Sequence, residues 1–153
     1  MKRNLSMISI ILMTVALMGL TALTALAHPR PFHLVEHGTL TQDPPGHLIT
    51  EGTGTATHLG RFTLHREATL KPSEDGSGLV DVVGRATLTA ANGDELKASI
   101  EGTLDPQTGK AVLTYEWKGG TGRFQNASGT TVWLVQVNPD QTYDVVADGI
   151  IND

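Results

Sequence analysis

The chain contains no cysteine among its 153 residues. Disulfide bonds, thiolate metal sites and cysteine nucleophiles are therefore excluded, and the packed core must stabilise the fold alone. Aromatic residues make up only 5% of the sequence, which limits how many can line a pocket once the core is filled. Beyond residue 27, helical periodicity also disappears.

Positive charge is scarce as well. The formal net charge is −5, with 11 Lys plus Arg against 16 Asp plus Glu. A nucleic-acid-binding protein needs clustered Lys and Arg to displace counterions from phosphates. This balance argues against such a protein, and equally against adhesion to anionic lipid.

The first 27 residues have the pattern of a secretory signal. Lys2 and Arg3 precede an almost wholly apolar run over residues 8–20, and Ala25–Ala27 supplies a small-x-small cleavage site. The apolar run approaches the ~20 residues of a permanent membrane anchor, but its threonines and the cleavage site favour removal. We therefore predict a signal peptide over 1–27 and a bacterial protein exported to the periplasm or secreted, with no membrane association after cleavage.

The remaining residues, 28–153, have the length of one domain. They carry nine Lys plus Arg and sixteen Asp plus Glu, so the formal charge of the mature chain is −7.

Strict alternation of apolar and polar residues recurs along this domain. Alternation with period two predicts half-buried β-strands. The clearest predicted inward-facing sets are Phe62, Leu64, Arg66, Ala68 and Leu70, then Leu96, Ala98, Ile100, Gly102 and Leu104, then Ala111, Leu113, Tyr115 and Trp117, and finally Thr131, Trp133, Val135 and Val137.

Short turns separate the predicted strands. Asn92-Gly93 predicts a short hairpin turn, because both residues tolerate positive φ, and proline or glycine turns follow residues 42, 104 and 137. Counting the segments gives about eight strands without room for crossover helices. We therefore predict an all-β domain, either a sandwich or, as we prefer, a single antiparallel barrel, because closure removes exposed sheet edges.

Glycines frame the segment Gly119–Gly129, which lies between two predicted strands. Glycine at both ends allows the chain to turn sharply twice. Thr121 is placed to cap a single helical turn, whose one large apolar residue, Phe124, would fold under the sheet. The segment thus predicts a crossover anchored by an aromatic side chain.

Taken together, Gly54–Phe62, Ala90–Asp94 and Gly119–Gly129 resemble bacterial exported proteins with an allene oxide cyclase-like β-barrel, which is dirigent-like and calycin-like in architecture. The resemblance covers most of the domain in the right order. It implies a barrel interior that binds a hydrophobic small molecule, and in some members guides a cyclisation or coupling. Because the matching motifs are turn and crossover residues, it assigns no catalytic residue here.

Arg66 is a charged residue on a predicted inward face, alternating with Phe62 and Leu64. A buried guanidinium needs a partner, which is either an acid of this protein or the carboxylate of a ligand. A strand bulge near His65 would instead turn Arg66 out to solvent, which is the more ordinary outcome. Arg66 is nevertheless our candidate for a polar group in a ligand site.

Three aromatic residues complete the candidate ligand-binding set: Tyr115, Trp117 and Trp133. Such residues usually fill a core. In a barrel they can also line a pocket, where the phenol and the indole N–H serve as polar handles.

No metal site or cofactor is predicted. The six histidines form neither a zinc cluster nor an HExxH motif, so we expect surface or loop positions, with His58 bonded to nearby backbone. His28 would become the first residue after cleavage and is the one candidate for copper chelation by a free amino group beside an imidazole. No Gly-x-Ser-x-Gly elbow is present, and no catalytic constellation stands out.

Three functions follow from these patterns. The first is a barrel that binds a small hydrophobic or amphipathic molecule in its interior. The second is a solid barrel with a structural or interaction role at its outer face, which predicts an exposed apolar patch. The third is a cyclase or isomerase of the allene oxide cyclase-like type, which requires an ionisable group at the pocket wall.

Overall fold

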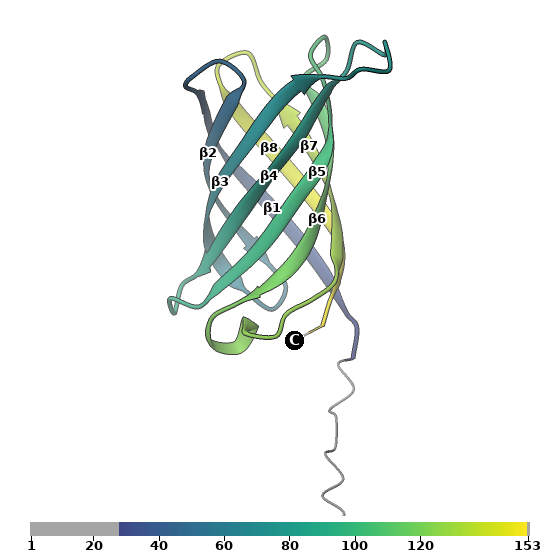
Figure 1. Ribbon diagram of the computed structural model, residues 1–153. Coiled ribbons are helices and arrows are strands. Elements are labelled where there is room, and N and C mark those ends of the chain that lie inside the picture. Colours follow the sequence, from purple (N-terminus) through teal and green to yellow (C-terminus); the bar gives the residue numbers. More distant parts are fainter. Residues whose placement is uncertain (1–27, 153) are drawn as a thin grey trace, which may run out of the picture.

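The predicted alternation produces eight antiparallel strands that close into one barrel (Figure 1). The structure, a computed structural model, describes residues 28–152. The predicted signal peptide, residues 1–27, lies outside them. Within the described part, no helix is long and apolar enough to cross a membrane.

The strands follow one another around the barrel in chain order. They are β1 (Arg30–Gln42), β2 (His47–Ala56), β3 (Gly60–Pro72), β4 (Val80–Ala90), β5 (Glu95–Asp105), β6 (Lys110–Gly120), β7 (Thr130–Val137) and β8 (Thr142–Ile151), with one 3₁₀ turn, η1 (Gly122–Phe124), between β6 and β7.

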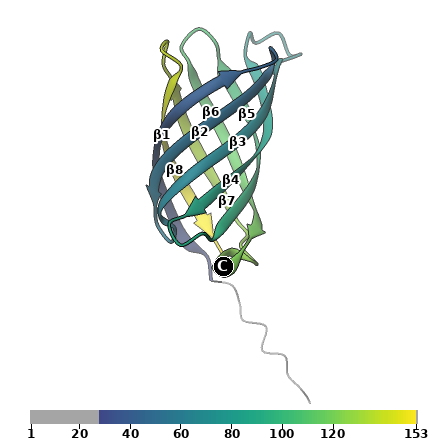
Figure 2. The same ribbon diagram turned by 90° about the vertical axis from the view of Figure 1, so that its left-hand side faces the viewer.

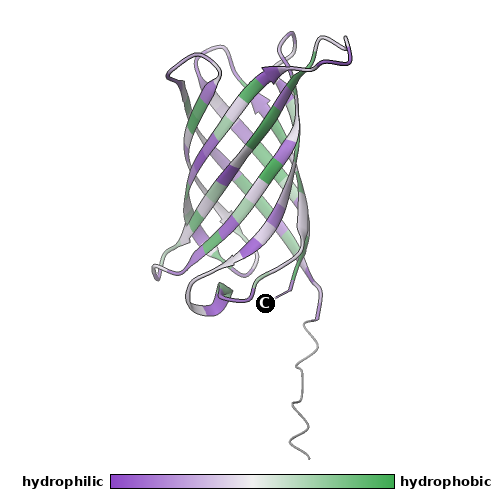
Figure 3. Cartoon of the chain, in the orientation of Figure 1, coloured by the Kyte–Doolittle hydropathy of each residue, from purple (hydrophilic) through white to green (hydrophobic). Residues whose placement is uncertain are grey.

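Pairing of β1 with β8 closes the barrel, with Leu34 opposite Ala147. Every strand therefore has two hydrogen-bonded neighbours, and no sheet edge is left open. Both side views show the strands tilted against the barrel axis, as closure requires (Figures 1 and 2). Hydrophobic and hydrophilic residues alternate along each strand (Figure 3), and the apolar ones form the core inside the ring.

The hairpin predicted at Asn92-Gly93 joins β4 and β5. The amide of Gly93 donates to the carbonyl of Ala90, and the amide of Ala90 donates to the carbonyl of Asp94. Gly93 has a φ of 89°, whereas Asn92 is not among the residues with positive φ. One left-handed residue is therefore enough for this turn.

The glycine-framed crossover closes one end of the barrel. Phe124 is fully buried, as predicted, in the single turn η1. The predicted cap is wrong, because the Thr121 side chain makes no capping hydrogen bond to η1. Its hydroxyl instead accepts a hydrogen bond from the amide of Glu95, which ties the crossover to β5.

The two ends of the barrel differ. At the end that carries the crossover and both termini of the barrel, large apolar side chains are buried, including Phe32, Leu96 and Phe124. The opposite end, at the top of Figure 1, carries four hairpin turns, between β1 and β2, β3 and β4, β5 and β6, and β7 and β8. Its apolar side chains are only partly buried: Leu40, Leu48, Leu70, Leu104 and Val137. We call this end the mouth.

We predict that Phe124→Ala destabilises the barrel by about 3–5 kcal/mol, because it removes a fully buried ring from the closed end. Urea unfolding followed by circular dichroism measures the change. Gln125→Ala, at the exposed neighbouring position, serves as the control and should change stability by less than about 0.5 kcal/mol. Equal midpoints for the two variants would contradict the closing role of Phe124.

Candidate functional site

Arg66 lies inside the barrel, on β3, with 3% of its surface exposed. The alternative that a bulge near His65 turns it outward is wrong. Pairing of β3 with both neighbours runs without a register shift, so that Arg66 lies opposite Thr50 on β2 and Ala86 on β4. Because the ladder is continuous, the inward alternation that begins at Phe62 passes through Arg66 unchanged.

The acid partner of Arg66 belongs to the protein itself. Glu36 on β1 is buried, and its Oε1 lies 3.5 Å from Nη2 of Arg66. The hydroxyl of Tyr143, on β8, donates a hydrogen bond of 2.5 Å to the same Oε1. Three strands thus bring one cation, one carboxylate and one phenol together inside the barrel.

Two glycines make room for this cluster. A Cβ on Gly52 would overlap the Tyr143 hydroxyl and lie 2.6 Å from Glu36 Oε1. A Cβ on Gly38 would lie 2.7 Å from the same hydroxyl. Real side chains do not approach so closely, so the phenol and the carboxylate lie directly over bare backbone.

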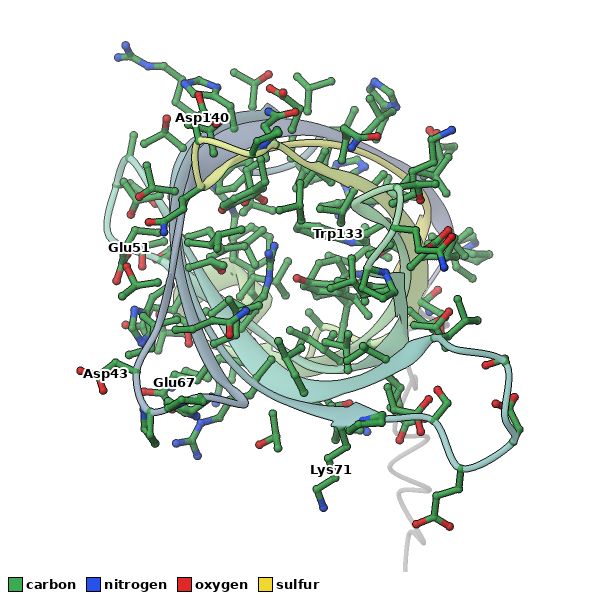
Figure 4. All side chains as sticks on the ribbon, turned by 90° about the horizontal axis from the view of Figure 1, so that it is seen from above. Asp43, Glu51, Glu67, Lys71, Trp133 and Asp140 are labelled. Carbon is green, nitrogen blue, oxygen red and sulfur yellow. The ribbon has the colours of Figure 1, made fainter. Side chains whose placement is uncertain are left out.

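Aromatic rings surround the guanidinium. Its central carbon lies 5.4–5.6 Å from the ring centroids of Tyr115, Trp133 and Tyr143, within the range of cation–π attraction. Tyr115 and Trp133 stack on each other, with centroids 3.8 Å apart and planes 5° from parallel. Figure 4 looks down the axis from the mouth and shows Trp133 within the ring of strands.

Several polar atoms of the cluster have no hydrogen-bond partner. They are Arg66 Nε and Nη2, Glu36 Oε2, Thr50 Oγ1, Tyr115 Oη and, farther toward the closed end, Trp117 Nε1. Buried polar groups in folded proteins are nearly always paired, with protein or with ordered water. Unpaired donors on a charged group are especially costly and mark this cluster as a place where a ligand group or water would be stabilised.

A cavity of about 40 Å³ lies between the cluster and the mouth. Its polar lining comes from Thr50, Arg66 and Tyr143, and the rest is apolar, including the mouth residues. A volume of this size holds about two or three water molecules. The interior is therefore largely filled, as expected for eight strands, with one small space above Arg66.

Of the four predicted site residues, Arg66 lines this cavity. Tyr115, Trp117 and Trp133 are all buried but are not among its lining residues. Tyr115 and Trp133 form the wall behind the guanidinium, whereas Trp117 packs against Phe32 at a centroid distance of 5.1 Å. Trp117 therefore belongs to the core of the closed end.

Sequence reasoning missed three residues of the cluster: Glu36, Thr50 and Tyr143. The signal was present for Glu36, because it follows Phe32 and Leu34 in the same alternation. An acid on an apolar face is the partner that a buried arginine on another strand requires.

Burial raises the pKa of Glu36 above its usual value, although the positive charge of Arg66 and the Tyr143 hydrogen bond act against the shift. Burial also raises the pKa of Tyr115 and of Tyr143, so both phenols stay protonated near neutral pH. The guanidinium keeps its charge. The site thus holds one permanent cation and one carboxyl whose charge depends on its surroundings.

The histidines lie outside this cluster, and none is buried. His58 Nε2 lies 3.0 Å from the carbonyl oxygen of Pro31, which confirms the predicted bond to backbone. His33 and His65 pair with the carboxylates of Asp148 and Glu51 on the outer face. Among residues 28–152, no group of three or more His, Asp or Glu is placed to hold a metal ion.

No protein-family model matches the chain, and a comparison with curated proteins found no match either. The closed eight-stranded antiparallel barrel is the fold that the resemblance to allene oxide cyclase-like proteins implies.

We predict that Gly52→Ala destabilises the barrel by about 1–3 kcal/mol, because the added methyl group displaces the Tyr143 hydroxyl and the Glu36 carboxylate. Thermal unfolding measures the loss. Thr53→Ala, exposed on the same strand, is the matched control and should change stability by less than about 0.5 kcal/mol. Identical melting of both variants would mean that the cluster is not held tightly against β2.

Proposed function

We propose that this protein binds a small amphipathic molecule inside its barrel, with the polar group of the ligand at Arg66 and the apolar part toward the mouth. The single observation that carries the proposal is a buried guanidinium that lines a cavity and has two nitrogens, Nε and Nη2, without a hydrogen bond. The partly buried leucines of the mouth line the same cavity, so a polar group and apolar side chains meet in one space. Ligand pockets commonly combine an apolar lining with a few polar groups of this kind.

The size of the cavity restricts the ligand. About 40 Å³ accommodates a compact polar group, and a longer apolar chain must extend among the mouth residues. Because the opposite end is filled by Phe124 and its neighbours, we propose that the ligand enters and leaves through the mouth.

The N-terminal signal pattern supports a role outside the cytoplasm, in the periplasm or the medium, and we propose that residues 1–27 are removed on export. Membership of the allene oxide cyclase-like family also stays a proposal. It is supported by the barrel fold and by the three matching segments. A cyclase or isomerase would have Glu36 and Arg66 as inward ionisable groups, but nothing places a reacting atom beside them.

Straight-chain primary alcohols test the binding proposal, because they carry a small polar group and no charge. We expect affinity to rise roughly fourfold per added methylene from 1-hexanol to 1-nonanol, as each group enters the apolar mouth. Nuclear magnetic resonance titration measures the affinities and locates the contacts.

Leu70→Arg, in the mouth, should weaken binding of these alcohols at least tenfold. Val83→Arg is the matched control, because Val83 lies on the outer face of β4 and is 57% exposed. Loss of binding in both variants, or in neither, would contradict entry through the mouth.

One observation favours a second candidate, in which the barrel acts through its outer face by self-association. Val35, Val146, Leu134 and Val112 are consecutive cross-strand partners on β1, β8, β7 and β6, and each is more than 40% exposed. All four line a depression of about 1260 Å³ that runs across the outer face. Such a row fits the same row on a second copy of the chain.

Analytical ultracentrifugation at micromolar concentration tests this second candidate. The wild type should sediment as an oligomer, and Leu134→Lys should sediment as a monomer because it places a charge within the apolar row. Val83→Lys, which alters an equally exposed apolar residue outside the row, should behave as the wild type. A monomeric wild type would exclude self-association as the role of this face.

A further inference from the structure

Arg66 and Glu36 are the two charged residues buried among residues 28–152. They do not face the cavity equally. Arg66 lines it together with Thr50 and Tyr143, whereas Glu36 is not among its lining residues and lies 3.5 Å from the guanidinium. The arginine therefore has an internal anion beside it and borders a small, mostly apolar cavity.

We infer that the polar group of the ligand is a single oxyanion bound by Arg66, and that its binding is coupled to the uptake of one proton by Glu36. This inference rests on the proposed function, because it requires that the ligand occupies the cavity above Arg66. It names the chemistry of the ligand and the condition that controls its binding.

Arg66 has donors that make no hydrogen bond. Its Nε and Nη2 form the side-on pair of N–H groups that binds a carboxylate through two parallel hydrogen bonds. Neither is hydrogen-bonded, although Nη2 lies 3.5 Å from Glu36 Oε1 in the ion pair. The Thr50 hydroxyl, opposite Arg66 on the neighbouring strand, is also unpaired and lines the same cavity. A cavity of about 40 Å³ favours a planar carboxylate over a larger, doubly charged phosphate.

Charge balance in the buried cluster requires a proton when an oxyanion binds. Arg66 and an ionised Glu36 together are neutral, so an added oxyanion would leave the buried cluster with one net negative charge. Such a charge is costly in a medium of low dielectric constant. A proton on Glu36 restores neutrality, and the guanidinium then serves the ligand alone.

The groups around Glu36 cannot take up the proton in its place. Arg66 on β3 stays charged, and Tyr143 on β8 and Tyr115 on β6 are already protonated. On β2, Gly52 lies beside the Glu36 carboxylate and carries no charge.

On β1 itself, His37 points outward, where its Nε2 lies 3.5 Å from Thr53 Oγ1, and it acts on Glu36 only through its charge. Burial already raises the pKa of Glu36, which is the direction that protonation requires.

Calorimetric titration with octanoate tests the coupling. At pH 7 and above the carboxyl group of octanoate stays ionised, since this is at least ~2 units above the pKa of an aliphatic carboxylic acid. Titrations at one pH in two buffers of different ionisation enthalpy count the protons taken up. We expect about one proton per octanoate, and an affinity that falls up to tenfold per pH unit above the pKa of Glu36 in the free protein.

Variants and a neutral probe separate the possible outcomes. Glu36→Gln should bind octanoate without proton uptake and without pH dependence, and more tightly at neutral pH. Glu116→Gln, which alters an exposed glutamate paired with Lys118, should behave as the wild type. Binding of 1-octanol should involve no proton.

Binding of octanoate without proton uptake overturns the coupling. If Arg66→Gln binds octanoate and 1-octanol with the same affinities as the wild type, the role of the arginine is overturned. Binding of 1-octanol but not octanoate overturns the inference while the proposed function stands. If neither probe binds, the proposed function itself fails. The proton count on the wild type needs no variant, so it decides the question even if Glu36→Gln does not fold.

Discussion

The burial of one guanidinium inside a narrow barrel is the constraint on which the rest of the interior depends. An unpaired charge in such a place would cost more than the fold could offset, so β1 must supply an acid and β8 a phenol at matching heights. The glycines of β1 and β2 then follow, because side chains there would exclude both groups. Ring faces around Arg66 supply the remaining electrostatic support without using its N–H groups.

This arrangement is not what packing alone would select. Replacing a buried ion pair by well-packed apolar residues of similar volume is often neutral or stabilising. Most of this barrel is packed in that way, from Phe124 at the closed end to the leucines of the mouth. The polar cluster is therefore a local exception within an otherwise apolar interior, and exceptions of this kind are where binding or chemistry is normally found.

The sequence was sufficient for the strands and their inward faces, because period two is a local property that each segment displays by itself. Arg66 shows the limit of prediction from local sequence patterns. Its alternation pointed inward, but only the unbroken pairing with β2 and β4 excludes a bulge. The partnership with Glu36 and Tyr143 depends on closure between the first and last strands, which no local pattern contains. That Gly93 alone is left-handed in the turn between β4 and β5 likewise depends on the register of the strands it joins.

The unequal ends of the barrel have a practical consequence. The barrel starts and finishes at the closed end, near the crossover, while the mouth is bordered only by hairpin turns (Figure 1). A surface tether or a fused reporter domain attached at residue 28 or residue 152 would thus sit on the far side from the mouth. Barrels immobilised in this way would present their mouths outward, in a common orientation, as an array for screening compounds.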